Sequence, residues 1–126
     1  MRVVDVSALT DLVRDLALEA NFRLPPDVVR ALEEAHSRET SPGGRRVLAD
    51  LRENGRVAQE DGLPLCQDCG LAVVVLDVGE EVTFSGKGVE EAVHEGIRQA
   101  YRQGYLRKSV VSDPLFDRRN TGDNTP

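Results

Sequence analysis

The sequence predicts an α+β fold: an N-terminal helical bundle followed by a small β-sheet, expected as a hairpin, with one packed helix. In the first half, apolar residues recur at helical spacing between capping residues and prolines. In the second half, two short runs rich in Val precede another segment of helical periodicity. We therefore expect a single domain over residues 1–126, with a helical part at 1–62 and an α/β part at 63–126.

The helical part contains three expected helices. Ser7 can cap the first, which runs to about residue 20 with its leucines and a valine on one face. Two consecutive prolines stop and restart the chain before a second helix at 27–37. Ser41 followed by Pro42 predicts the start of a third helix, which extends to about residue 54 and resumes toward residue 60. These apolar faces are interpreted as core.

The α/β part opens with a loop and two expected strands. Residues 71–78 and 82–85 are apolar runs, and the Gly79-Glu80-Glu81 segment between them predicts a hairpin. Residues 89–105 return to helical periodicity, with a stripe made of Val89, Val93, Ile97 and Ala100. Arg107 is therefore expected just beyond the C-terminal end of that helix.

Composition excludes several classes of protein. The net charge is -6 and Arg is far commoner than Lys, whereas a nucleic-acid-binding protein usually carries a basic face. The chain contains two cysteines, no long apolar segment and no N-terminus of signal-peptide type. We therefore expect a protein of the cytoplasm that binds neither nucleic acid nor membrane, in a compartment that keeps thiols reduced.

The segment Pro64-Leu65-Cys66-Gln67-Asp68-Cys69-Gly70 sets a soft metal ligand, an amide and a carboxylate side by side on a predicted loop. A thioredoxin-like pair would have a strand before it and a helix after it, which is the reverse of the order here. A structural zinc site needs four ligands, and only two histidines accompany the two cysteines. A disulfide is disfavoured by the short spacing and the expected compartment. Two half-buried thiols beside a strand remain an alternative to a functional site.

A second segment bears on that choice. Residues 105–114, Tyr-Leu-Arg-Lys-Ser-Val-Val-Ser-Asp-Pro, lead into the Asn-Thr-Gly-Asp-Asn-Thr-Pro sequence at 120–126. Together the two segments resemble the N-terminal part of the alpha subunit of class I, iron-sulfur fumarate hydratases, a family that includes the L-tartrate dehydratases. The resemblance is close from about residue 63 to residue 126 and looser through the helical half.

The resemblance implies a role for each matched residue. Cys66 is expected to be one of three thiolate ligands of a 4Fe-4S cluster, with the other two cysteines outside this chain. Gln67, Asp68 and Arg107 are expected to contact a small dicarboxylate, because guanidinium and amide groups match carboxylate and hydroxyl oxygens. Asp68 is the expected catalytic acid or base, acting at the carbon next to a carboxylate.

The implied activity is that of a hydro-lyase, the reversible hydration of fumarate to (S)-malate, with L-tartrate dehydration as the alternative. The family's loop usually reads Cys-Gln-Asp-Thr-Gly, whereas this chain has Cys69 in place of the Thr, and we do not expect Cys69 to be a ligand. The chain is expected to be a fragment, inactive alone, that works with a beta subunit or C-terminal domain in a homo- or hetero-oligomer. A non-catalytic assembly or binding module of the same fold remains the hypothesis from another class. The Asn and Asp residues at 120–124 are interpreted as turn formers.

Overall fold

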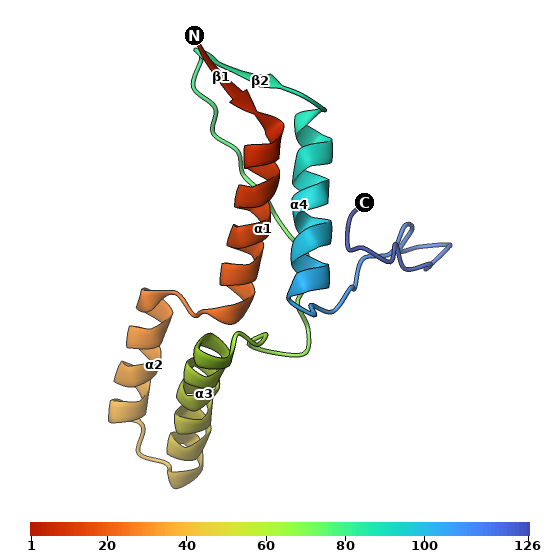
Figure 1. The fold of residues 1–126 in the computed structure, drawn as a ribbon. Coiled ribbons are helices and arrows are strands. Elements are labelled where there is room, and N and C mark those ends of the chain that lie inside the picture. The colour runs from red at the N-terminus through yellow and green to blue at the C-terminus, as the bar shows by residue number, and fades with distance from the viewer. The chain divides into compact units, whose positions relative to one another are not determined.

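The computed structural model describes residues 1–126 and contains helices and strands in the order β1, α1, α2, α3, β2 and α4 (Figure 1). Their bounds are Arg2–Asp5 for β1, Val6–Phe22 for α1, Pro26–Arg38 for α2, Pro42–Asp61 for α3, Val82–Ser85 for β2 and Val89–Gln103 for α4. The predicted α+β class is confirmed. The chain divides into two compact units, which we call the strand unit, Met1–Leu18 with Gln67–Pro126, and the helical unit, Glu19–Cys66.

Helices α2 and α3 begin at prolines, as predicted, but the prediction that Ser7 caps the first helix is wrong: α1 begins at Val6, and the Asp5 carboxylate accepts from the Ser7 N–H at 2.8 Å. At the start of α3, the Ser41 hydroxyl accepts a hydrogen bond from the Gly44 N–H at 3.4 Å, and Gly62 ends the helix with a left-handed φ of 63°. The expected interruption of this helix near residue 54 is wrong, because α3 is continuous to Asp61. The Asn54 side chain donates to the Leu65 carbonyl at 2.8 Å instead of competing for its own helix backbone.

The sheet differs from the predicted hairpin. The strand Val82–Ser85 is confirmed as β2, but it pairs in parallel with the N-terminal strand β1, from Arg2 opposite Val82 to Asp5 opposite Ser85. Residues 71–78 form no strand. The N–H of Arg2 donates to the Glu81 carbonyl at 2.7 Å, so the N-terminal strand takes the place beside β2 that the hairpin partner would need. The sequence reading missed β1 because Arg2–Asp5 is short and mostly polar or exposed.

The apolar run at 71–76 is exposed where a buried strand was expected. Val73 and Val75 are 87% and 89% exposed, and Leu71 is 71% exposed. Such a run reads as a buried strand only if other elements cover it. In the strand unit of this chain no element pairs with it, so its apolar content alone does not produce a strand.

The core of the strand unit lies between α1 and α4. Figure 1 shows the two helices side by side, and the Thr10 hydroxyl on α1 donates to the Ala92 carbonyl on α4 at 3.0 Å. A Cβ atom at Gly96 would lie 2.7 Å from the Thr10 carbonyl oxygen, so glycine permits this close approach. Ile97 and Ala100 of the predicted stripe are buried, as is Tyr101 one residue further on.

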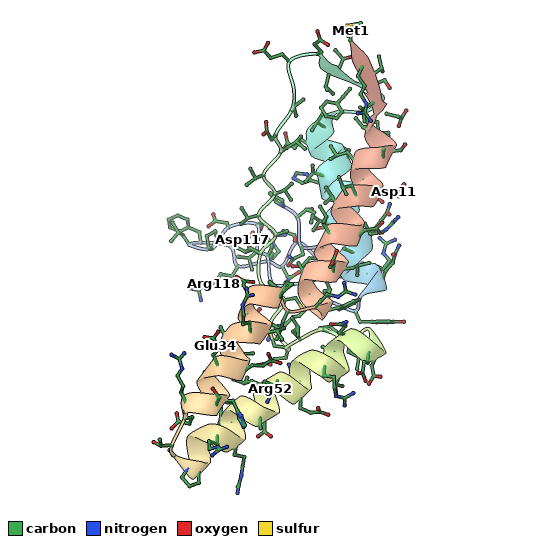
Figure 2. The ribbon with its side chains drawn as sticks, turned by 90° about the vertical axis from the view of Figure 1, so that its left-hand side faces the viewer. Met1, Asp11, Glu34, Arg52, Asp117 and Arg118 are labelled. Carbon is green, nitrogen blue, oxygen red and sulfur yellow. The ribbon has the colours of Figure 1, made fainter.

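The helical unit contains α2 and α3, which lie side by side (Figure 1). An ion pair of 3.7 Å joins Glu33 to Arg52, and Figure 2 labels Arg52 on α3 and Glu34, the neighbour of Glu33, on α2. The Leu65 N–H donates to the Asn21 carbonyl at 2.8 Å, which ties the chain after α3 back to the end of α1. None of the helices in either unit combines the length and the apolar character that crossing a membrane requires.

Candidate functional site

The loop that carries the predicted ligands begins where the helical unit ends. Cys66, Gln67 and Asp68 are exposed, and Cys69 is half-buried. The Asp68 carboxylate accepts a hydrogen bond from the Gly70 N–H at 3.2 Å, and Gly70 has a left-handed φ of 61°. An Asp side chain that bonds the backbone two residues further on stabilises a tight turn. The expected loop is therefore present, with its polar side chains at the surface.

Two side chains distant in sequence hold the end of this loop. The Tyr101 hydroxyl, on the last turns of α4, lies 2.9 Å from the Cys69 carbonyl oxygen and 3.1 Å from that of Gly70. The Asn124 side-chain amide donates to the Gly70 carbonyl at 3.3 Å. The strand expected directly after the loop is absent, and Tyr101 and Asn124 anchor the loop instead.

The Arg107 segment lies beside the same loop. The Arg107 backbone N–H donates to the Cys69 sulfur at an N···S distance of 3.1 Å. Gly104 ends α4, and Tyr105 follows with a left-handed φ of 53°. Leu106, 4% exposed, then inserts into the core while Arg107 remains at the surface. This geometry brings the backbone of Arg107 against the loop that contains Gln67 and Asp68.

The C-terminal turn completes the cluster. In Figure 1 the last residues run back beside α4. Asn124 and Thr125 are each 4% exposed, and the Oδ1 atom of the Asn124 side chain accepts from the N–H groups of Ser109 and Val110 at 2.6 and 3.1 Å. The prediction of a turn at residues 120–124 did not include the hydrogen bonds that Asn124 accepts from Ser109 and Val110. Asn at a left-handed position is a recognisable signal, but the partners of its side chain are set by tertiary structure.

Two groups near the loop have shifted pKa values. Burial raises the pKa of the Tyr101 phenol, and the nearby Cys69 and Asp68 raise it further. Burial opposes the ionised form of Asp123, but hydrogen bonds from the N–H and hydroxyl of Thr125 and the charge of Arg98 outweigh it and lower the pKa of Asp123. Tyr101 is therefore kept as a neutral hydrogen-bond donor to the loop at neutral pH.

The two thiols of the loop have no third side chain placed with them to hold a metal ion. No group of three or more His, Cys, Asp or Glu side chains is placed to hold a metal ion. Cys66 is exposed at the turn, and the two cysteines form no disulfide. The Cys69 sulfur instead contacts the Arg107 N–H. Of the two thiols, Cys66 is the more exposed, and the Cys69 sulfur already accepts a backbone N–H.

Comparison with known proteins extends over nearly the whole chain. A family model described as fumarate hydratase (Fumerase) matches residues 10–126. A protein of Methanocaldococcus jannaschii named "Putative L(+)-tartrate dehydratase subunit alpha" is 37% identical over 122 residues, which cover 94% of this chain and 42% of that protein. The L(+)-tartrate dehydratase subunit alpha of Escherichia coli K12 is 29% identical over 120 residues, or 95% of this chain and 39% of that protein. The chain thus spans about two fifths of the length of these curated relatives.

Proposed function

The chain belongs to the fumarate hydratase (Fumerase) family of hydro-lyases, and we propose that it provides the first part of an alpha subunit in an iron-sulfur enzyme that interconverts fumarate and (S)-malate. The observation that supports this most directly is the contact between the Arg107 backbone and Cys69, since it puts the backbone of Arg107 against the loop that carries Gln67 and Asp68. In hydration, a hydroxyl bonds to one alkene carbon and a proton to the other, and no electrons are transferred.

Each residue of the site has a proposed part in that reaction. Cys66 would hold the 4Fe-4S cluster through its thiolate. When bound, the cluster supplies a Lewis acid for the substrate carboxylate and hydroxyl. The chain contains two cysteines, so we propose that activity requires ligands from sequence outside residues 1–126.

The polar side chains act on the substrate. Arg107 can bind a carboxylate through two parallel N–H donors, and the Gln67 amide can both donate and accept. Asp68 is the proposed acid or base that moves a proton at the carbon next to a carboxylate. Its carboxylate already accepts from the Gly70 N–H, which limits where the side chain can point. The loop therefore presents Asp68 from a constrained turn.

L-tartrate is the second candidate substrate. The names of the two relatives above support it directly, since both are given as tartrate dehydratase alpha subunits. Fumarate and tartrate chemistry share a four-carbon dicarboxylate skeleton, so Arg107, Gln67 and Asp68 suit both. By analogy with those subunits we propose a beta subunit or C-terminal domain as the partner in an oligomer. We also propose a cytoplasmic location. A non-catalytic module of the same fold would keep the partner but not the reaction.

The test is anaerobic cluster reconstitution of the full-length subunit with its partner, followed by assays of fumarate loss and L-tartrate dehydration. Cys66→Ser should abolish both the cluster absorbance and turnover, whereas Cys69→Ser should keep the cluster. Turnover of L-tartrate without turnover of fumarate would assign L-tartrate as the substrate. A cluster that survives Cys66→Ser and is lost in Cys69→Ser would refute the ligand assignment, and the absence of cluster and turnover in the wild type would favour the non-catalytic module.

A further inference from the structure

Asn124 joins the two segments that carry the proposed substrate-binding groups. The Oδ1 atom of its side chain accepts from the Ser109 and Val110 N–H groups at 2.6 and 3.1 Å, and its NH2 group donates to the Gly70 carbonyl at 3.3 Å. The side chain is 4% exposed, so water does not replace these bonds easily. A primary amide offers an acceptor and donors at one end, as this bridge requires.

The backbone turn around Asn124 is held by hydrogen bonds of its neighbours. Its φ of 66° lies in the left-handed region, which Asn adopts more readily than most residues other than glycine. Next to it, the Asp123 carboxylate accepts from the N–H and hydroxyl of Thr125 at 3.1 and 2.9 Å. Arg98 on α4 lies 3.9 Å from the other oxygen of Asp123. The backbone of this turn is therefore held by bonds that are independent of the bond between the Asn124 amide and the loop.

The Gly70 carbonyl receives hydrogen bonds from two directions. Asn124 approaches it from the C-terminal turn, and Tyr101, 2% exposed, approaches it from α4. Gly70 follows Asp68 by two residues, and the two are also linked by the bond from the Gly70 N–H. The position of Gly70 thus determines where the turn with Gln67 and Asp68 ends.

We propose that Asn124 is a positioning residue that sets the Gln67–Asp68 turn at a fixed distance from the Arg107–Val110 segment. It does so through two backbone N–H groups of one segment and one carbonyl of the other. The kinetic consequence rests on the proposed function, in which a dicarboxylate bound by Arg107 must also contact Gln67 and Asp68. Displacement of a substrate-positioning group by about 1 Å can reduce the rate about 100-fold.

Asn124→Asp separates the two halves of the bridge. The carboxylate keeps the acceptor for the Ser109 and Val110 N–H groups, but it loses the donor to Gly70 and repels that carbonyl. The matched control is Asn120→Ala in the same turn. Asn120 also makes side-chain bonds to the backbone, donating to the Lys108 carbonyl at 2.9 Å and accepting from the Gly122 N–H at 2.7 Å, but neither reaches the loop.

The variants are compared in the reconstituted enzyme by steady-state kinetics with fumarate and L-tartrate, and by amide hydrogen exchange. Asn124→Asp should lower kcat/KM about 10- to 100-fold. The Arg107 amide, which donates to Cys69, should exchange at least about 10-fold faster, while the Ser109 and Val110 amides stay protected. Asn120→Ala should change kcat/KM less than about 3-fold, within the usual effect of an exposed substitution.

Wild-type kinetics and wild-type Arg107 exchange in Asn124→Asp would overturn the proposal. Equal losses in Asn120→Ala would also overturn it, because the effect would then belong to the turn as a whole. If the wild-type enzyme converts neither substrate while Asn124→Asp still accelerates Arg107 exchange, the proposed function fails and the bridge between the segments stands.

Discussion

Gly96 provides a quantitative test of how α1 and α4 pack. A Cβ atom at this position would lie 2.7 Å from the Thr10 carbonyl oxygen and 2.8 Å from the Val13 Cβ. These contacts would have to lengthen by roughly 0.7–1.3 Å to reach the optimal separation of non-bonded atoms. Such overpacking costs about 1–3 kcal/mol. Loss of the Thr10 to Ala92 hydrogen bond would cost about 1 kcal/mol, and replacing a helical glycine by alanine gains about 1 kcal/mol. The last two cancel, so Gly96→Ala should destabilise the strand unit by about 1–3 kcal/mol.

Gly55 on α3 is the matched control. A Cβ atom there would also meet a neighbour at 2.7 Å, but that neighbour is the Leu24 Cδ1, which can rotate away. Gly55→Ala should therefore leave stability unchanged or raise it by up to about 1 kcal/mol. Native-state hydrogen exchange of the α4 and α3 amides measures each unit separately. Amides of α4 that exchange no faster in Gly96→Ala than in the wild type would refute the close packing.

Alkaline pH should weaken the strand unit through Tyr101, whose pKa is raised from 10.0 by burial and, less strongly, by Cys69 and Asp68. The folded state holds the phenol proton more tightly than the unfolded chain, so this stabilisation is complete below about pH 10 and disappears as the pH rises through the raised pKa. Urea unfolding across that range should show that the unfolding free energy of the wild type falls more steeply with pH than that of Tyr101→Phe. Tyr105→Phe, which removes a phenol that is 91% exposed, should behave like the wild type. Equal slopes for all three proteins would contradict the assignment to Tyr101. Leu106→Ala should lower the unfolding free energy by about 2–4 kcal/mol, because Leu106 is 4% exposed. Leu115→Ala, at a side chain 79% exposed, should change it by less than about 0.5 kcal/mol in the same titration, and similar values for both would place Leu106 outside the core.

Local signals in the sequence predicted much of the secondary structure. Ser41 and Pro42 predicted the start of α3, and apolar periodicity predicted α4 with Ile97 and Ala100 inward. These predictions succeeded because caps, prolines and helical faces depend on neighbours within a few residues. The loop at residues 66–70 was also predicted, from the glycines and proline around it. Its assignment to ligand and substrate roles stays a prediction, supported by the family.

Pairing between distant segments could not be read in the same way. The run at 71–78 has the composition of a buried strand, but β1 occupies the place beside β2, and the run is exposed. Nothing local to Arg2–Asp5 indicates that it pairs with residues 80 positions away. The composition of a segment indicates how well its side chains fit a β-sheet, whereas the strand with which it pairs depends on the fold of the whole chain.

The sequence by itself determined the helices, the position of β2, the polar loop at Cys66 to Asp68 and the family to which the chain belongs. Only the tertiary structure decided that β1 pairs with β2 and that the Arg107 amide lies against Cys69. It also decided that Tyr101 and Asn124 anchor the loop at Gly70. The physical reason is that a buried amide or phenol must find hydrogen-bond partners, and which backbone groups become those partners is set by how distant segments pack.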